Sequence, residues 1–178
     1  MKKLGIMILI MGIVASCNTM FKPTNSTQTS ATGQVIEERG FRLPERFDNF
    51  RLDIIRRKAN QGRDFIYLRA EHVGPERLMV TKLWVNIDGD TTRVYEVPPS
   101  QTLRADQQTP DGRDRNRYYL RQVEHFIFTE NLLNLMLEAK TSVTFTIIGE
   151  NQHYGANLYT GQDLESFQTS LRDLAKKE

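Results

Sequence analysis

Short stretches in which every second residue is apolar recur along the chain, and they limit the folds that it can adopt. A period of two places the apolar side chains on one face of a β-strand. Two such stretches are separated by the turn-forming residues 60–62, and a third is followed by the sequence HYGANLY, which we expect to be its hairpin partner. The apolar members are Phe50, Leu52, Ile54, Ile66, Leu68, Ala70, Val143, Phe145 and Ile147.

The clearest predicted hairpin lies between residues 77 and 97. An Asp-Gly pair between alternating apolar runs favours a tight turn, and here Asp88 and Gly89 supply it before a return strand through Val94. Prolines 98 and 99 end the return strand. The residues expected on one face of the first strand are Met79, Leu83, Val85 and Ile87.

Two other segments show the period of a helix. The first follows Thr129, a suitable N-cap residue, and extends to Lys140. The second begins near Asp163, and Lys176 and Lys177 suit the negative end of its dipole. The apolar stripes are Leu132, Leu135, Met136 and Ala139, and then Leu164, Phe167, Leu171 and Leu174.

These elements predict the fold class. Strands in hairpin order without βαβ alternation argue against a parallel sheet. We expect an α+β domain with an antiparallel β-sheet or sandwich of about six to seven strands and two helices packed on one side.

The first residues of the chain form a different kind of segment. Lys2 and Lys3 precede an apolar run at residues 4–13, and small residues follow it. This order is typical of a secretory signal peptide over residues 1–16. The apolar run is shorter than the roughly 20 residues that a membrane span requires. The alternative is a buried N-terminal helix.

The sequence VASC at residues 14–17 resembles the lipobox of bacterial lipoproteins. The resemblance implies that a diacylglycerol is attached to Cys17, that the chain is cut before it, and that an acyl chain is added to its amino group. Val14, Ala15 and Ser16 would be recognised by the signal peptidase. In lipoproteins of the enterobacterial type, Asp after the cysteine signals retention in the inner membrane, so the resemblance implies that Asn18 favours the outer membrane, on its periplasmic or surface side. The resemblance covers the first 17 residues and implies nothing about the domain beyond.

Residues 18–34 are rich in Asn, Thr, Ser and Gln and show no apolar periodicity, and the predicted tether covers residues 17–40. We expect them to form a flexible tether with an end-to-end distance of roughly 25 Å. Residues 41–178 would then form one globular domain. Of the 24 basic residues, Lys2 and Lys3 precede Cys17, so that 22 basic and 22 acidic residues follow and the formal charge is zero. The composition thus gives no indication of a nucleic-acid partner.

The histidines do not indicate a metal site. His72 and His125 each follow a glutamate, but adjacent strand residues point to opposite faces and cannot chelate together. His153 has no partner at metal-ligand spacing. His125 alternates with Val123 and Ile127, which favours a hydrogen-bonded core histidine.

Known catalytic and calcium motifs also fail to match. The sequence NIDGD at residues 86–90 resembles the start of an EF-hand loop, but Thr91 and Val97 occupy the positions that require Gly and Glu. A cysteine nucleophile is excluded if Cys17 carries lipid. Asp111 and Asp114 could pair as acid and base, although solvated surface residues are the simpler interpretation. We therefore expect neither enzymatic activity nor a cofactor other than the covalent lipid.

A polar loop at residues 100–116 contains the most basic part of the domain. In an extended conformation, Arg113, Arg115 and Arg117 would project to one side, near Arg104, and could bind carboxylates or phosphates. The alternative is a solvated loop whose aspartates neutralise the arginines. A second basic run, Arg56-Arg57-Lys58, is expected at a solvated hairpin tip.

The sequence supports two functional hypotheses. In the first, a lipid-anchored envelope protein binds another envelope protein or cell-wall glycan without catalysis, aided by its confinement to the membrane. In the second, it is a small envelope hydrolase or ligand carrier that acts on cell-wall or lipid material. The second requires a concave pocket with converging polar groups, of about 300 to 1,000 Å³.

Overall fold

The computed structural model describes residues 21–29, 35–44, 50–59, 64–75, 78–101, 105–110, 118–150 and 152–176. The chain is an α+β protein built mainly of antiparallel strands, which confirms the predicted fold class. Its elements are β1 (Lys22–Thr29), β2 (Val35–Arg42), β3 (Phe50–Ala59), β4 (Phe65–Gly74), β5 (Val80–Ile87), β6 (Val94–Val97), β7 (Ala105–Pro110), β8 (Tyr118–Ile127), α1 (Glu130–Glu138), β9 (Ser142–Gly149), β10 (His153–Thr160) and α2 (Gly161–Ala175).

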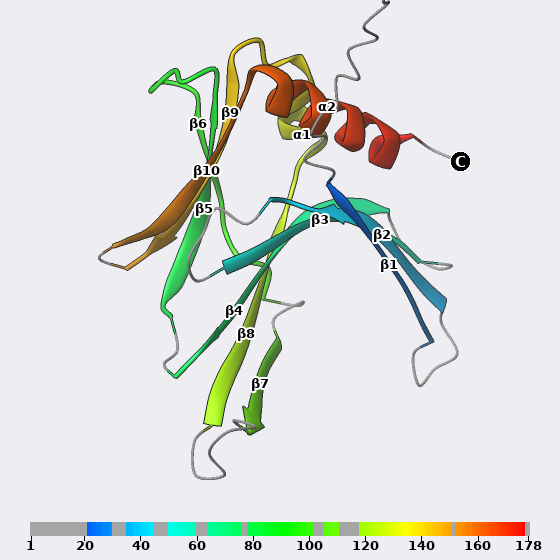
Figure 1. The fold of residues 1–178 in the computed structure, drawn as a ribbon, viewed down its shortest axis with the longest axis vertical. Helices are drawn as coiled ribbons and strands as arrows, with labels where there is room; N and C mark the ends of the chain where they lie inside the picture. Colours follow the sequence, from blue (N-terminus) through cyan, green and yellow to red (C-terminus); the bar gives the residue numbers. More distant parts are fainter. Residues whose placement is uncertain are drawn as a thin grey trace, which may run out of the picture.

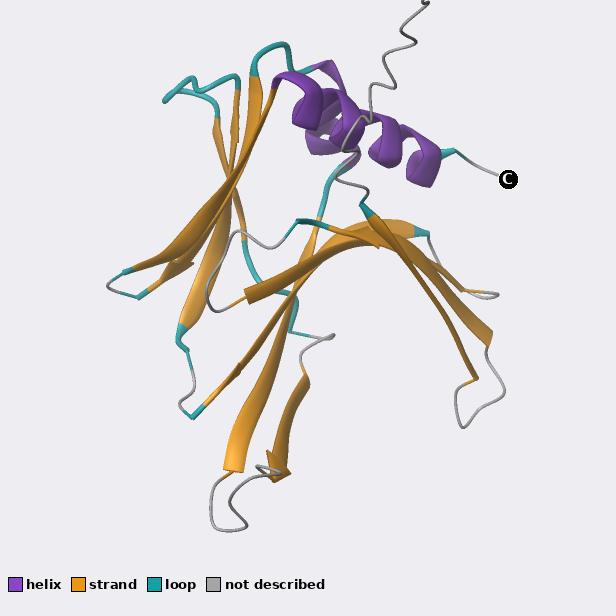
Figure 2. Cartoon of the chain, in the orientation of Figure 1, coloured by secondary structure: helices purple, strands orange, loops and turns teal. Residues whose placement is uncertain are grey.

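The strands form two sheets. The large sheet has six strands in the order β1-β2-β3-β4-β8-β7, and the small sheet has four in the order β10-β9-β5-β6. Figure 1 shows the large sheet bent over along β2 and β3, with both helices on the convex side. The helices lie together on that side, as expected (Figure 2).

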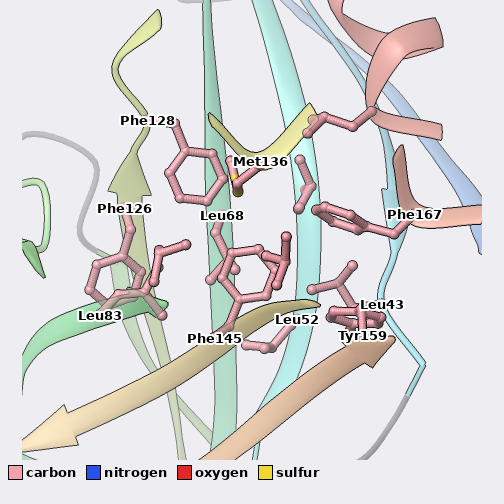
Figure 3. Packing of buried hydrophobic residues seen from close by; sticks show 14 of the residues in the cluster. Leu43, Leu52, Leu68, Leu83, Phe126, Phe128, Met136, Phe145, Tyr159 and Phe167 are labelled. Carbon is pink, nitrogen blue, oxygen red and sulfur yellow. The ribbon is translucent and has the colours of Figure 1, made fainter. Parts of the chain in front are cut away.

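The hydrophobic core lies between the sheets and the helices. Alternate residues of the strands supply it, as the period-two pattern predicted, and Figure 3 shows Leu52 and Leu68 of the large sheet facing Phe145 of the small one. Phe167 of α2 stacks on Tyr159 at 5.2 Å between ring centroids. Because α2 contacts β2, β3, β9 and β10, it joins the two sheets.

Part of the predicted tether is folded. β1 and β2 pair in the antiparallel direction, and β2 continues onto β3, so the expected boundary at Gly40 falls inside a strand. Phe21 lies 5.4 Å from Phe41, centroid to centroid, next to the core. The alternation rule misses β1 because this edge strand has polar residues on both faces. Residues 17–20 and 30–34 of the predicted tether lie outside the described residues.

Gly40 explains how β2 approaches β3 so closely. A β-carbon at this position would lie 2.2 Å from the carbonyl oxygen of Ile54 and 2.9 Å from the Cα of Ile55. These are backbone atoms, which cannot rotate away. Glycine within a strand is typical of such close contacts and of sharp bends.

Three other predictions need correction. Met79 is exposed, because the register shifts between Val80 and Lys82 and breaks the alternation. The turn after β5 contains more residues than the predicted pair Asp88 and Gly89, because the last paired residues are Asn86 and Val94. Asp88 and Gly89 do adopt the positive φ angles of a tight turn, 61° and 68°. Within the predicted 100–116 loop, the structure contains the edge strand β7, paired with β8.

The helices begin close to their predicted positions. The Thr129 hydroxyl caps α1 by accepting a hydrogen bond from the Leu132 amide at 3.2 Å. α2 begins at Gly161. Arg56 donates hydrogen bonds to the carbonyls of Leu174 and Lys176, at the end of this helix. Arg56 is therefore part of the contact between β3 and α2, and it does not lie at the solvated hairpin tip that the sequence predicted. None of the helices in the described ranges has the length and apolar character needed to cross a membrane.

Candidate functional site

The concave side of the large sheet carries a dense set of charged side chains. In antiparallel strands, residues that face each other across the ladder point to the same side of the sheet. Register therefore places the alternating charged residues of β2, β3, β4 and β8 together, opposite the core. We call this surface the arginine face; its charged members are Glu38, Arg42, Arg51, Asp53, Arg57, Arg69, Glu71 and Arg121.

Asp53 lies at the centre of this face with its side chain fully buried. It pairs in register with Arg42 on one side and Arg69 on the other. Its carboxylate accepts hydrogen bonds from Arg42 Nε at 3.3 Å and from an Arg69 terminal nitrogen at 2.7 Å. Arg51 Nε lies 3.6 Å from the same carboxylate. A buried carboxylate needs such partners, because it has lost its hydration.

Glu38 and Tyr67 form a second polar group on this face. The Tyr67 hydroxyl donates to one Glu38 oxygen at 2.8 Å, and the Ser26 hydroxyl donates to the other at 3.3 Å. Burial of the phenol, together with the nearby Glu38 charge, raises the pKa of Tyr67. The phenol therefore stays protonated and remains a donor.

Glu71 and Arg121 form a third group. Arg121 donates through Nε at 2.8 Å and through a terminal nitrogen at 3.2 Å, one to each Glu71 oxygen. This bidentate bond lowers the pKa of Glu71 and raises that of Arg121. Since each partner satisfies the other, this pair contributes little free charge to the surface.

An open pocket of about 340 Å³ lies where β1, β2, β3 and β4 meet. Its lining includes Thr24, Ser26, Glu38, Arg51, Ile55 and Arg69. Three donor groups in this lining have no hydrogen-bond acceptor among the described residues: the Thr24 hydroxyl, Arg51 Nε and Arg69 Nε. The pocket therefore combines positive charge with the partly exposed guanidiniums of Arg51 and Arg69, whose N–H groups can donate hydrogen bonds to a ligand oxygen.

No protein-family model, curated protein or solved structure matches this chain. The chemistry of the pocket follows from its own geometry.

The residues predicted to form the lipidation site and the basic loop are not among those that the structure describes. The lipidation residue Cys17 and its neighbours lie outside the described residues, as do Asp111, Asp114 and the four arginines of the polar loop. The complete set outside is Val14, Ala15, Ser16, Cys17, Arg104, Asp111, Arg113, Asp114, Arg115 and Arg117.

The histidines lie in three separate environments. His72 is buried beside Phe50, with a centroid distance of 5.4 Å, whereas the exposed His153 contacts Trp84 at the same distance. His125 is not a core histidine: it lies on the arginine face, 5.2 Å from Tyr67. The core side of β8 instead carries Gln122, which bonds to both backbone groups of Leu78. Within the described ranges, no group of three potential metal-ligating side chains occurs.

The sequence did not reveal the arginine face, because the charged residues that alternate with the apolar ones form no local motif. Alternation in RLDIIRRK placed Arg51 and Asp53 away from the core, which is correct. One signal was available: Ile55 is also on that side, and an apolar residue among charges indicates a partly buried surface. The partners of Asp53, however, depend on register across three strands.

Proposed function

We propose that this protein is a lipid-anchored binding module of the bacterial cell envelope, without a catalytic role, and that the arginine face is its contact surface. The observation that carries the proposal is the asymmetry of the large sheet. Its core side is filled by the small sheet and the helices, whereas its concave side presents charged groups and a pocket. The partner would be another envelope protein or a cell-wall glycan.

The proposed anchor would hold the domain close to the lipid. β1 begins at Lys22, and its first aromatic contact is made by Phe21. The chain from Cys17 to Phe21 spans at most about 14 Å, at up to 3.6 Å per residue. A lipidated Cys17 would therefore keep the β1 edge and the adjoining pocket near the membrane surface. This arrangement raises the effective concentration of a partner in the same envelope.

One observation favours the alternative of a ligand carrier or hydrolase. The pocket volume of about 340 Å³ reaches the range of small-molecule sites. Its polar lining suits a water-soluble ligand better than a lipid tail. A hydrolase would differ from the other two in turnover, because a binding module and a carrier both release their ligand unchanged.

The anchor is tested by replacing Cys17 with serine. In cells fed a radioactive fatty acid, the parent protein should be labelled and should migrate as the processed form. C17S should accumulate as an unlabelled precursor, because the thiol that accepts the lipid is missing. A labelled, processed C17S protein would contradict the lipoprotein proposal.

The contact surface is tested by site-specific photo-crosslinking in intact cells. A photoreactive residue at Ser26, in the pocket lining, should form a discrete crosslinked product with an envelope component. The matched control is Glu165, an exposed residue of α2 on the opposite side of the large sheet. Equal products from both positions, or none from Ser26, would contradict a binding role for the arginine face.

A further inference from the structure

We propose that the pocket beside Asp53 binds a sugar that carries a carboxylate or a phosphate, with the anionic group held between Arg51 and Arg69. This inference rests on the proposed function, since it names the ligand chemistry of the same surface. It follows from three properties of the pocket: its charge, its donors and the position of Glu38.

The charge around Asp53 is not balanced within its own cluster. One carboxylate faces the guanidiniums of Arg42, Arg51 and Arg69. Glu38 adds a second negative charge, but Arg57 lies opposite it in register on the same face. Among the described residues, positive charge therefore exceeds negative charge around the pocket. Arginines gathered at a partly buried site repel one another, and a bound anion relieves this repulsion.

The partly exposed guanidiniums of Arg51 and Arg69 point to an oxyanion. Arg69 uses a terminal nitrogen for Asp53, while its Nε is buried without an acceptor in the described part of the chain. Arg51 Nε is also buried without an acceptor among the described residues, and its contact with Asp53 is longer, at 3.6 Å. Guanidinium N–H groups bind carboxylate and phosphate oxygens with strong, charge-assisted hydrogen bonds. Thr24 of β1 also lines the pocket, and its buried hydroxyl has no hydrogen-bond partner among the described residues.

Glu38 determines what must accompany the anionic group. Its two oxygens accept hydrogen bonds from Tyr67 and Ser26, so the carboxylate is fixed in place and repels a second anion at that end. A carboxylate oxygen can accept more than one hydrogen bond. The part of the ligand beside Glu38 must therefore supply neutral donors, which the hydroxyl groups of a sugar do.

The size of the pocket agrees with this ligand. At roughly 30 Å³ per water in the liquid, 340 Å³ corresponds to about eleven waters. One monosaccharide with its anionic substituent fits such a space, whereas an extended glycan would have to leave through the open side. A single acidic sugar within a longer chain, or a free one, would make the same contacts.

The test is a calorimetric titration of the full-length protein in detergent. The probes are D-glucuronate for the carboxylate, glucose 6-phosphate for the phosphate, and glucose as the neutral sugar. Saturable binding of either acidic probe, with glucose at least tenfold weaker, is expected. The two acidic probes distinguish the sources: the tighter one identifies the anionic group.

Two substitutions locate the binding. Arg51→Gln removes one guanidinium that makes no close bond to Asp53, and should raise the Kd of the tighter probe about tenfold. Arg93→Gln, in the exposed turn before β6, makes the same charge change far from the pocket and should leave the Kd within twofold. Circular dichroism confirms that both variants are folded. If R51Q did not fold, Thr24→Val, which removes a hydroxyl at constant size, should still weaken binding severalfold.

Absence of saturable binding by both acidic probes would overturn the inference, as would equal losses in R51Q and R93Q. Binding of glucose as tight as that of the acids would overturn it as well. A crosslink at Ser26 without binding of either acid would leave the proposed function standing and remove only its ligand. Binding of an acid without that crosslink would support the ligand assignment and contradict the proposed contact with an envelope component.

Discussion

The two sides of the large sheet bury side chains for different reasons. On the core side, apolar residues such as Leu68 and Phe126 lose contact with water and pack against the small sheet. On the arginine face, Asp53 and Tyr67 are equally inaccessible, yet they belong to a network of charges and hydrogen bonds. Apolar burial contributes directly to stability. Burial of an ion pair offsets much of its attraction by desolvation.

This difference indicates what each side is for. A charged network that adds little to stability is a poor choice for a sheet face with no other role, because polar residues exposed to water would be simpler. The arginine face retains a buried carboxylate beside buried donors that have no acceptor among the described residues. We interpret the core side as the support of the fold and the arginine face as the functional surface. The following predictions test that division, from the largest effect to the smallest.

Phe167→Ala should have the largest effect. The side chain is fully buried between the sheets and packs on Tyr159. Removing it should lower the free energy of unfolding by about 3 to 5 kcal/mol, measured by urea denaturation. The control is Ile127→Ala on the arginine face, where the side chain is 38% exposed and the loss should stay below about 1 kcal/mol. Equal losses of unfolding free energy in the two variants would contradict the view that the core side, and not the arginine face, supports the fold.

Asp53→Asn should have an intermediate effect on stability. It leaves Arg42, Arg51 and Arg69 without their shared anion, and we expect a loss of about 2 kcal/mol because these arginines are partly exposed to water. The same change should tighten the binding of glucuronate or glucose 6-phosphate, because it removes a competing carboxylate. Asp173→Asn, in an exposed ion pair, is the control and should alter neither quantity. A more stable D53N protein with unchanged binding would contradict the charge argument.

Tyr67→Phe should cost about 1 kcal/mol, the usual contribution of one buried hydrogen bond. The variant keeps the ring beside His125 but removes the donor to Glu38. Urea denaturation measures the loss. Since the pKa of Tyr67 is raised, the parent protein should also show no phenolate absorbance from this residue at pH 10, at which an ordinary tyrosine is half ionised.

Glu71→Gln should have the smallest effect on stability, and this effect should be present at neutral pH and absent at acidic pH. The hydrogen bond from Arg121 holds the folded pKa of Glu71 below its ordinary value of 4.5. The pair therefore contributes stability above pH 4.5, and this contribution is lost as the pH falls through the folded pKa. Thermal unfolding of the parent and the variant should differ at pH 7 and converge toward pH 3. A constant difference over this range would show that the ion pair is not its cause.

Local patterns were sufficient to predict much of the fold. The alternating strands, the Thr129 cap and the stripe of α2 depend on neighbouring residues and could be read directly. β1 could not be predicted, because an edge strand of polar residues has no apolar period. It is held in place by pairing with β2 and by Phe21.

The candidate site could not be predicted for a related reason. The 100–116 loop was the candidate basic site in the sequence, because its arginines are close together along the chain, with a solvated loop as the alternative. The arginines that meet around Asp53 come from three strands, and their meeting depends on the register between those strands. The close approach of β2 to β3 at Gly40 requires a glycine at that point of the register. These are properties of the whole sheet rather than of any short segment.

The most direct test of the account is a nuclear magnetic resonance titration of the full-length protein with the tighter of the two acidic sugars. The amide signals of Thr24, Arg51 and Arg69 should shift together and saturate with one Kd. Those of Trp84 and Glu96, which lie on the outer side of the small sheet, should stay in place. Shifts centred on Trp84, or spread evenly over both sheets, would contradict the assignment of the arginine face as the binding surface.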